Sequence, residues 1–138
     1  GVNLTSAFLL AKASHEALRA RRGSLVLISS TNGLNGGSAL SGPAYAVAKA
    51  GIINLARYLA KEWGADGIRV NCVAPGPVDT PMLARLPEST VDSLRQSIPL
   101  GRVATADDVA ASIAFLCSNQ ACYLTGTVMN VSGGLVLD

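Results

Sequence analysis

The run Ser24-Leu25-Val26-Leu27-Ile28-Ser29-Ser30 holds four consecutive apolar side chains between serines. A short unbroken apolar run is typical of a strand buried on both faces, as in a parallel sheet. Two later segments, 68–74 and 126–131, have a similar strand character and are each bounded by glycine or proline. We therefore predict three strands, at 24–28, 68–74 and 126–131.

Helical patterns separate these strands. Apolar residues recur at helical spacing within 4–20 and within 43–63, and again after a capping-box sequence at 105–108. Helices and strands therefore alternate along the chain. This order favours an α/β fold with a doubly wound parallel sheet and right-handed crossovers, formed as a single domain over 1–138.

Two segments between these elements are predicted to lack long regular structure. Residues 31–43 contain four glycines, which favours a loop. Residues 78–100 contain three prolines and are expected to be irregular or weakly helical. Because long loops in compact domains often cover functional sites, we expect a lid over about 78–100.

The composition excludes several classes of protein. Hydrophobic residues make up 49% of the 138 residues and charged residues 14%, which is far from a disordered composition. A net charge of +2 does not indicate a nucleic-acid or membrane partner, and no apolar run approaches the ~18 residues of a spanning helix. Cys72, Cys117 and Cys122 form no CxxC or Cys–His cluster. We expect free thiols, a cytoplasmic location and no metal site, with His15 on a helix surface.

A tyrosine and a lysine lie four residues apart near the start of the helix predicted at 43–63. Positions i and i+4 share a helix face, so the Tyr45 phenol and the Lys49 ammonium are expected to lie on the same side. An ammonium held near a phenol favours the phenolate form, which suits the phenol for general acid/base catalysis. The spacing alone is common by chance, and the alternative is that Tyr45 packs while Lys49 is solvated.

Three separate stretches converge on one edge of the predicted sheet. Ser29 and Ser30 end the first strand, and residues 75–80 follow the second. Tyr45 and Lys49 open the helix between these two strands. Since ligands of open parallel sheets bind outside the carboxyl ends of the strands, we expect a ligand site at this edge.

With these motifs in order, the chain resembles the carboxyl-terminal part of a short-chain dehydrogenase/reductase. In style it is closest to 3-oxoacyl-acyl-carrier-protein reductases and glucose dehydrogenases. One such motif is weakly specific, whereas five in the family's order are highly specific. The resemblance implies a Rossmann-like fold of which this chain holds the catalytic half. The matching stretches are Val2-Asn3-Leu4, Ile28-Ser29-Ser30, Tyr45 with Lys49, 68–71 leading into 74–80, and 125–126 before 131–134.

The resemblance also implies a role for each matching catalytic residue. Tyr45 would protonate a carbonyl oxygen as hydride arrives, or accept the proton in the alcohol direction. Lys49 would hold the nicotinamide ribose hydroxyls and favour the phenolate of Tyr45. Ser30 would donate a hydrogen bond to the substrate oxygen, and Asn3 would position a water in a proton relay to Lys49. The structural alternatives are a serine that caps a turn and an asparagine that caps a helix.

The implied cofactor is NAD or NADP, and the implied substrate is a small-molecule carbonyl or secondary alcohol. The segment after the second strand would pack on the nicotinamide, with Thr80 bonding the carboxamide. The family resemblance further implies a homo-oligomer, a dimer or tetramer, with contacts through the helix at 43–63 and the last helix and strand. The implied cofactor-binding residues are Tyr45, Lys49, Pro75, Gly76, Val78 and Thr80.

Three features depart from the family pattern. No glycine-rich turn that would bind the pyrophosphate occurs before Asn3, so about half of the expected fold is absent, including the residue that selects NAD or NADP. Either that half precedes Gly1 in a longer protein or the gene is truncated. The interval from Ser30 to Tyr45 is longer than usual in the family. Ser132 stands where the family commonly has aspartate before paired glycines.

A different function follows if the amino-terminal half does not exist. The chain would then be a non-catalytic remnant that acts only as an assembly or binding module. A half sheet would also leave the edge of the strand at 24–28 open, which favours association or aggregation. A hydrolase that uses Ser30 and Lys49 is a third interpretation, but nothing in the sequence indicates an oxyanion hole.

Overall fold

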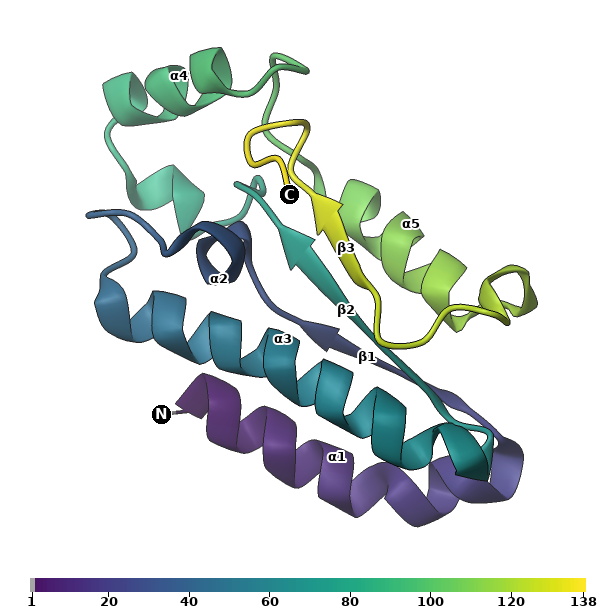
Figure 1. The fold of residues 1–138 in the computed structure, drawn as a ribbon. Helices are drawn as coiled ribbons and strands as arrows, with labels where there is room; N and C mark the ends of the chain where they lie inside the picture. Colours follow the sequence, from purple (N-terminus) through teal and green to yellow (C-terminus); the bar gives the residue numbers. More distant parts are fainter. Residues whose placement is uncertain (1) are drawn as a thin grey trace.

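A computed structural model describes residues 2–138 and shows helices and strands alternating along the chain (Figure 1). The strands are β1 (Ser24–Ile28), β2 (Arg69–Pro75) and β3 (Val128–Val131). They form one parallel sheet in the order β1-β2-β3, in which Leu27 pairs with Cys72 and Cys72 pairs with Val128. The α/β fold with a parallel sheet is therefore confirmed, and each predicted strand is found.

Different helices cover the two faces of the sheet (Figure 1). Helices α1 (Val2–Arg21), α2 (Thr31–Asn35) and α3 (Pro43–Trp63) lie on one face. Helix α5 (Ala106–Cys117) lies on the other, and α4 (Glu88–Ser97) lies beyond the carboxyl ends of the strands. Three 3₁₀ turns connect these elements: η1 (Gly64–Asp66), η2 (Leu83–Arg85) and η3 (Asn119–Ala121).

The core lies between α3 and the sheet. Helix α3 packs on β2 with one side and on α1 with another, which explains why its sequence is apolar on more than one face. Removing this apolar surface from water is the main stabilising contribution to the fold. No residue of α4, in contrast, is buried. The core cluster comprises Ala11, Leu27, Ile52, Ile53, Ala56, Leu59, Ala60, Ile68, Val70 and Cys72.

The loop predicted over 31–43 is wrong for its first five residues, which form α2. The side chain of Ser30 caps this helix by accepting a hydrogen bond from the Asn32 amide at 3.1 Å. Gly36 ends it in the left-handed conformation, with φ 86°. The many glycines indicate a loop, but a cap at each end is enough to fix one short helix.

The ends of α1 also differ from expectation. The helix begins at Val2, so Asn3 lies inside its first turn and does not precede it. At the other end Arg22, with φ 51°, takes the left-handed conformation. The Gly23 amide then donates to the Leu18 carbonyl at 2.9 Å, which closes the helix.

His15 keeps 27% of its side chain exposed on α1, as expected for a helix-surface residue, and its ring also packs against the end of α3. The ring centroid lies 4.7 Å from that of Trp63, and Nε2 lies 3.1 Å from Oδ2 of Asp66. No local motif indicates this contact, since His15 and Asp66 are far apart along the chain.

The capping box predicted at 105–108 is confirmed at the start of α5. The Thr105 hydroxyl accepts from the Asp108 amide at 3.2 Å, and the Asp108 carboxylate accepts from the Thr105 amide at 2.7 Å. Within residues 2–138, no helix is long and apolar enough to cross a membrane.

Candidate active site

Tyr45 and Lys49 lie on the same face of the first turns of α3, as their spacing predicts. The Lys49 Nζ is 5.5 Å from the centroid of the Tyr45 ring. Pro43 occupies the first turn of the helix, where a missing N–H does no harm. Tyr45 as a whole is 37% exposed.

Lys49 is tied to the carboxyl end of β1 at two points. Its Nζ donates to the Ile28 carbonyl at 3.3 Å, and its own carbonyl accepts from the Ser29 hydroxyl at 2.7 Å. Partial burial lowers the pKa of the Lys49 ammonium from its ordinary value, and the nearby Cys72 opposes this with a smaller effect. The strand end therefore fixes where the ammonium lies.

Ser30 is brought to the same place by the packing of α2 on α3. A Cβ on Gly33 would lie 2.7 Å from the Lys49 carbonyl carbon and 2.8 Å from the Ala50 nitrogen, so only glycine allows this approach. Ser30 is 8% exposed, and its oxygen is the acceptor that caps α2. A hydroxyl that accepts one hydrogen bond still has its hydrogen to donate.

Asn3 lies on the exposed first turn of α1, beside the helix that carries Lys49. Its neighbour Leu4 packs against Gly51 of α3, where an added Cβ would meet the Leu4 Cδ2 at 2.9 Å. The amino end of α1 therefore packs on the face of α3 that carries Gly51, which at two residues from Lys49 lies about 200° around the helix from it.

The segment predicted to contact a nicotinamide follows β2 at the same end of the sheet. Pro75 is the last residue of β2, and the Gly76 amide donates to the Val131 carbonyl at 2.9 Å. Val78 forms an isolated parallel bridge with Ala104. Thr80 is exposed, and its Oγ1 accepts from the Leu83 amide at 3.4 Å. The segment after β2 thus leaves the sheet at the same carboxyl edge as Ser30, where Lys49 of α3 bonds to Ile28.

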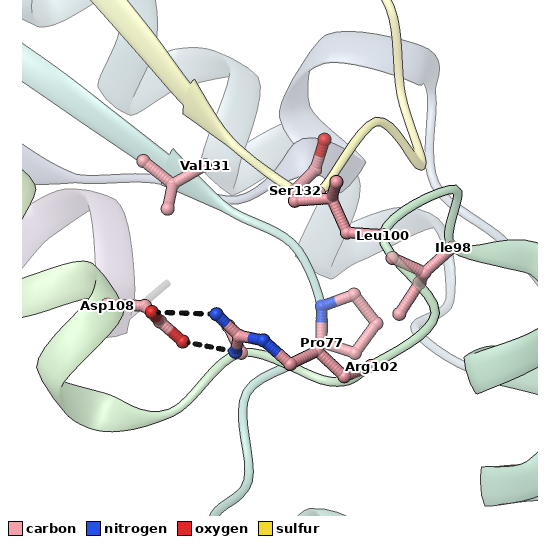
Figure 2. Close-up of a pocket in the computed structure, with 9 residues that line it drawn as sticks. Pro77, Ile98, Leu100, Arg102, Asp108, Val131 and Ser132 are labelled. Atoms are coloured by element: carbon pink, nitrogen blue, oxygen red, sulfur yellow. Dashed lines mark hydrogen bonds and ion pairs between the residues drawn. The ribbon is translucent and has the colours of Figure 1, made fainter.

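Beside this segment lies a cavity of about 200 Å³ that sequence reasoning did not find (Figure 2). Its apolar lining carries one ion pair, in which Arg102 donates to both carboxylate oxygens of Asp108 at 2.6 and 3.0 Å. The sequence shows Asp108 only as part of a capping box, and nothing at Arg102 marks its partner. The lining residues are Pro77, Ile98, Leu100, Arg102, Ala104, Asp108, Val131, Ser132 and Gly133.

Metal chemistry has no evident ligands in this part of the protein. Within residues 2–138 there is no cluster of three or more histidine, cysteine, aspartate or glutamate side chains. The cysteines at 72, 117 and 122 are free thiols, of which only Cys72 is buried.

Comparison with known proteins identifies the family. Residues 1–136 match the family described as enoyl-(acyl carrier protein) reductase. The crystal structure of an oxidoreductase of the short-chain dehydrogenase/reductase family from Burkholderia thailandensis superposes with a TM-score of 0.86 at 43% identity, covering 97% of this chain and 53% of that one. The chain belongs to the short-chain dehydrogenase/reductase family.

Several short-chain dehydrogenase/reductase relatives are close in sequence. The chain is 45% identical over 118 residues to the 3-oxoacyl-acyl-carrier-protein reductase FabG of Chlamydia muridarum, which covers 86% of this chain. It is 41% identical over 138 residues to the (3R)-3-hydroxyacyl-CoA dehydrogenase of Homo sapiens, which covers 99% of this chain. The chain spans about half the length of these curated relatives, 47% and 52% respectively.

A second solved structure supports the same fold for this short-chain dehydrogenase/reductase chain. The 3-oxoacyl-acyl-carrier-protein reductase from Brucella melitensis superposes with a TM-score of 0.90 at 31% identity. The superposition covers 99% of this chain and 51% of that one. The predicted family and its Rossmann-like fold are therefore confirmed, for a portion of the family's usual length.

Proposed function

We propose that this chain carries the catalytic half of an NAD(P)-dependent oxidoreductase that transfers hydride between nicotinamide and a carbonyl or secondary alcohol. The observation that carries the proposal is the Tyr45–Lys49 pair on one face of α3, tied by Lys49 to the end of β1. Membership of a family whose relatives are named reductases and dehydrogenases supports it.

The described residues fit the nicotinamide end of such a cofactor. An ammonium on Lys49 and a hydroxyl on Thr80 are the kinds of donor that ribose hydroxyls and a carboxamide accept from. Gly76 has no side chain, so a flat ring can approach its backbone closely. Pro75 and Val78, which flank Gly76 in the sequence, add apolar surface. Within residues 2–138, no glycine-rich turn links a strand to a helix start. The described residues therefore include no turn of the kind that binds a pyrophosphate.

The proposed chemistry of this chain is the movement of one proton at the Tyr45 hydroxyl. When bound, the nicotinamide supplies or accepts the hydride. Tyr45 gives its proton to the carbonyl oxygen in reduction and takes it back in oxidation, and the Lys49 ammonium favours the phenolate left behind. Ser30 donates a hydrogen bond that orients the substrate oxygen. Asn3 positions a water in a proton relay to Lys49, through which Tyr45 regains its proton after reduction.

The substrate class follows from the relatives' names only as a proposal. One relative is named a 3-oxoacyl-acyl-carrier-protein reductase and another a (3R)-3-hydroxyacyl-CoA dehydrogenase. A 3-oxoacyl or 3-hydroxyacyl thioester is therefore the first substrate to assay. We propose that residues 78–100 act as a lid over this substrate, since α4 has no buried residue to hold it in the core.

The direct test is Tyr45→Phe in the complete gene product, assayed with NADH and NADPH and a panel of ketones and 3-oxoacyl thioesters. Turnover should collapse, because phenylalanine cannot transfer a proton, while the far-UV circular dichroism spectrum stays unchanged. Tyr58→Phe is the matched control, since Tyr58 is on the same helix and 61% exposed. Undiminished turnover by Tyr45→Phe would overturn the proposed function.

The alternative function is an assembly module without catalysis. Exposed apolar side chains on α1 and α3 favour it, including Phe8, Leu9 and Val47, which are 53%, 56% and 71% exposed. If the chain is an enzyme, the same exposed apolar surface supports assembly into a homo-oligomer, a dimer or tetramer. The free thiols support a cytoplasmic location. Titration of the 138-residue chain with NADH and NADPH distinguishes the two functions. Saturable binding favours the enzyme, and intact oligomers that bind neither favour the module.

A further inference from the structure

The proposed nicotinamide-binding segment leaves the sheet after Gly76 and is then supported mainly by one residue, Ala104. The Ala104 amide donates to the Pro77 carbonyl at 3.1 Å, and the Asp79 amide donates to the Ala104 carbonyl at 2.8 Å. These two bonds form the isolated bridge between Val78 and Ala104. The position of residues 77–79 is therefore set by where Ala104 lies.

The chain around Ala104 is held in turn by hydrogen bonds to Asp108, of which Figure 2 draws those from Arg102. Two residues before it, Arg102 donates through both terminal nitrogens to the Asp108 carboxylate. One residue after it, Thr105 donates to the same carboxylate through its amide at 2.7 Å and its hydroxyl at 3.0 Å. Asp108 therefore binds the chain on both sides of Ala104 and fixes it to the start of α5.

Packing contributes little to this fixation. The cavity of about 200 Å³ lies beside Ala104, between Pro77 and the apolar side chains of Ile98 and Val131 (Figure 2). A cavity wall lacks contact atoms on one side, so it resists movement less than a close-packed wall. On the cavity side, hydrogen bonds with fixed directions, rather than side-chain packing, hold residues 102–105 in place.

We propose that Arg102 and Asp108 are positioning residues that hold the nicotinamide-binding segment 77–79 in place through Ala104, and so set cofactor affinity. This inference rests on the proposed function, because it concerns the same cofactor site. Neither residue touches the reacting atoms. The fork of a guanidinium paired with a carboxylate fixes orientation as well as distance, which a single charge contact does not.

Two physical points define the expected effect. An exposed ion pair adds little to global stability, so loss of Arg102 should loosen this segment without unfolding the protein. Hydrogen bonds from Arg102 and then from Thr105 hold the pKa of the Asp108 carboxyl well below its ordinary range. The pair therefore stays ionised at any pH used for a cofactor assay, and the effect should not depend on pH near neutrality.

The test uses the complete gene product without cofactor and compares wild type, Arg102→Ala and Arg102→Lys by amide hydrogen exchange. In Arg102→Ala, the Asp79 and Ala104 amides should exchange about fivefold faster. The Ser29 amide, bonded to the Val73 carbonyl in the sheet region, should not change. Arg102→Lys keeps the charge without the fork and should restore only part of the protection.

A matched control is Arg95→Ala. Arg95 pairs with Asp92 at 3.0 Å on α4 and is about as exposed as Arg102, 53% against 58%, but its ion pair lies within one helix. It should leave the Asp79 and Ala104 amides unchanged. The inference is overturned if Arg102→Ala leaves these two amides at wild-type rates, or if Arg95→Ala accelerates them equally.

Cofactor binding provides the functional half of the test. The dissociation constant for NADH or NADPH should rise about fivefold in Arg102→Ala, with kcat at saturating cofactor close to wild type. Equal affinity in the two proteins would overturn the inference while leaving the proposed function intact. A wild-type protein that binds neither cofactor would overturn the proposed function and the affinity claim together, and hydrogen exchange would still decide whether Arg102 holds segment 77–79.

Discussion

The two sides of the candidate site are held in different ways. On the side of α3, buried contacts and close backbone packing at Gly33 place Lys49, and six residues of the helix are buried. On the side of residues 76–104, two backbone hydrogen bonds and an exposed ion pair hold the proposed nicotinamide-binding segment, and α4 buries no residue. The proposed proton-transfer pair therefore stands on a helix anchored in the core, whereas the proposed binding segment is held at the surface.

The largest expected difference concerns stability. Ile52→Ala in α3 removes a side chain that is 3% exposed and should lower the free energy of unfolding by about 2–5 kcal/mol. Leu94→Ala in α4, where no residue is buried, should lower it by less than about 1 kcal/mol. Urea unfolding of the complete gene product measures both. Equal losses would show that α4 is part of the same cooperative core.

A smaller effect is expected where α2 approaches α3. Gly33→Ala places a methyl group within 2.9 Å of the backbone of Lys49 and Ala50, and should cost about 1–3 kcal/mol of stability by forcing the two helices apart. It should also lower turnover, because Ser30 moves away from Lys49.

Gly64→Ala serves as the control for this change, because an added Cβ there meets nothing within 4 Å. Thermal unfolding and turnover should both stay near wild type in that variant. If Gly33→Ala behaves like Gly64→Ala, the close approach of α2 does not position the site.

A third effect, on the binding side, concerns the cap of α5. Thr105→Ala removes the hydroxyl that accepts from the Asp108 amide and should cost about 0.5–2 kcal/mol. Ser89→Ala, in the first turn of α4, should cost less, since Pro87 rather than a side-chain acceptor occupies the cap of that helix. Chemical denaturation measures the difference in unfolding free energy. An equal cost for both variants would show that the Thr105 cap adds no stability of its own.

The smallest effect on stability at neutral pH is expected from the ionisation of Cys72, which lies in the core beneath α3. Burial raises the pKa of this thiol to about 11 from an ordinary 9.0, so the folded protein keeps it protonated. The unfolded thiol ionises first as pH rises, and stability should therefore be intact below about pH 9 and decline between about 9 and 11. Because lysines and tyrosines also titrate there, the measurement is the difference in unfolding free energy between wild type and Cys72→Ala across this range. Replacement of the exposed Cys117 should not alter the slope.

The sequence predicts the strongly patterned parts of this fold and the residues with local motifs. The apolar runs predict all three strands, and the four-residue spacing predicts that Tyr45 and Lys49 share a face. Contacts between distant residues escape it. Nothing local marks Gly33 as the point where α2 meets α3, and nothing marks Arg102 as the partner of Asp108. The helix at 31–35 was missed because its caps, Ser30 and Gly36, also suit a loop.

The most direct test of this division between core and surface is a parallel measurement of kcat and cofactor affinity in Tyr45→Phe and Arg102→Ala. Tyr45→Phe should lower kcat by about 10²–10⁴-fold with a much smaller effect on cofactor affinity, because the ring stays and only the hydroxyl is lost, and Arg102→Ala should weaken cofactor binding with kcat nearly unchanged. Wild-type turnover by Tyr45→Phe, or a loss of kcat in Arg102→Ala as large as that in Tyr45→Phe, would contradict this division.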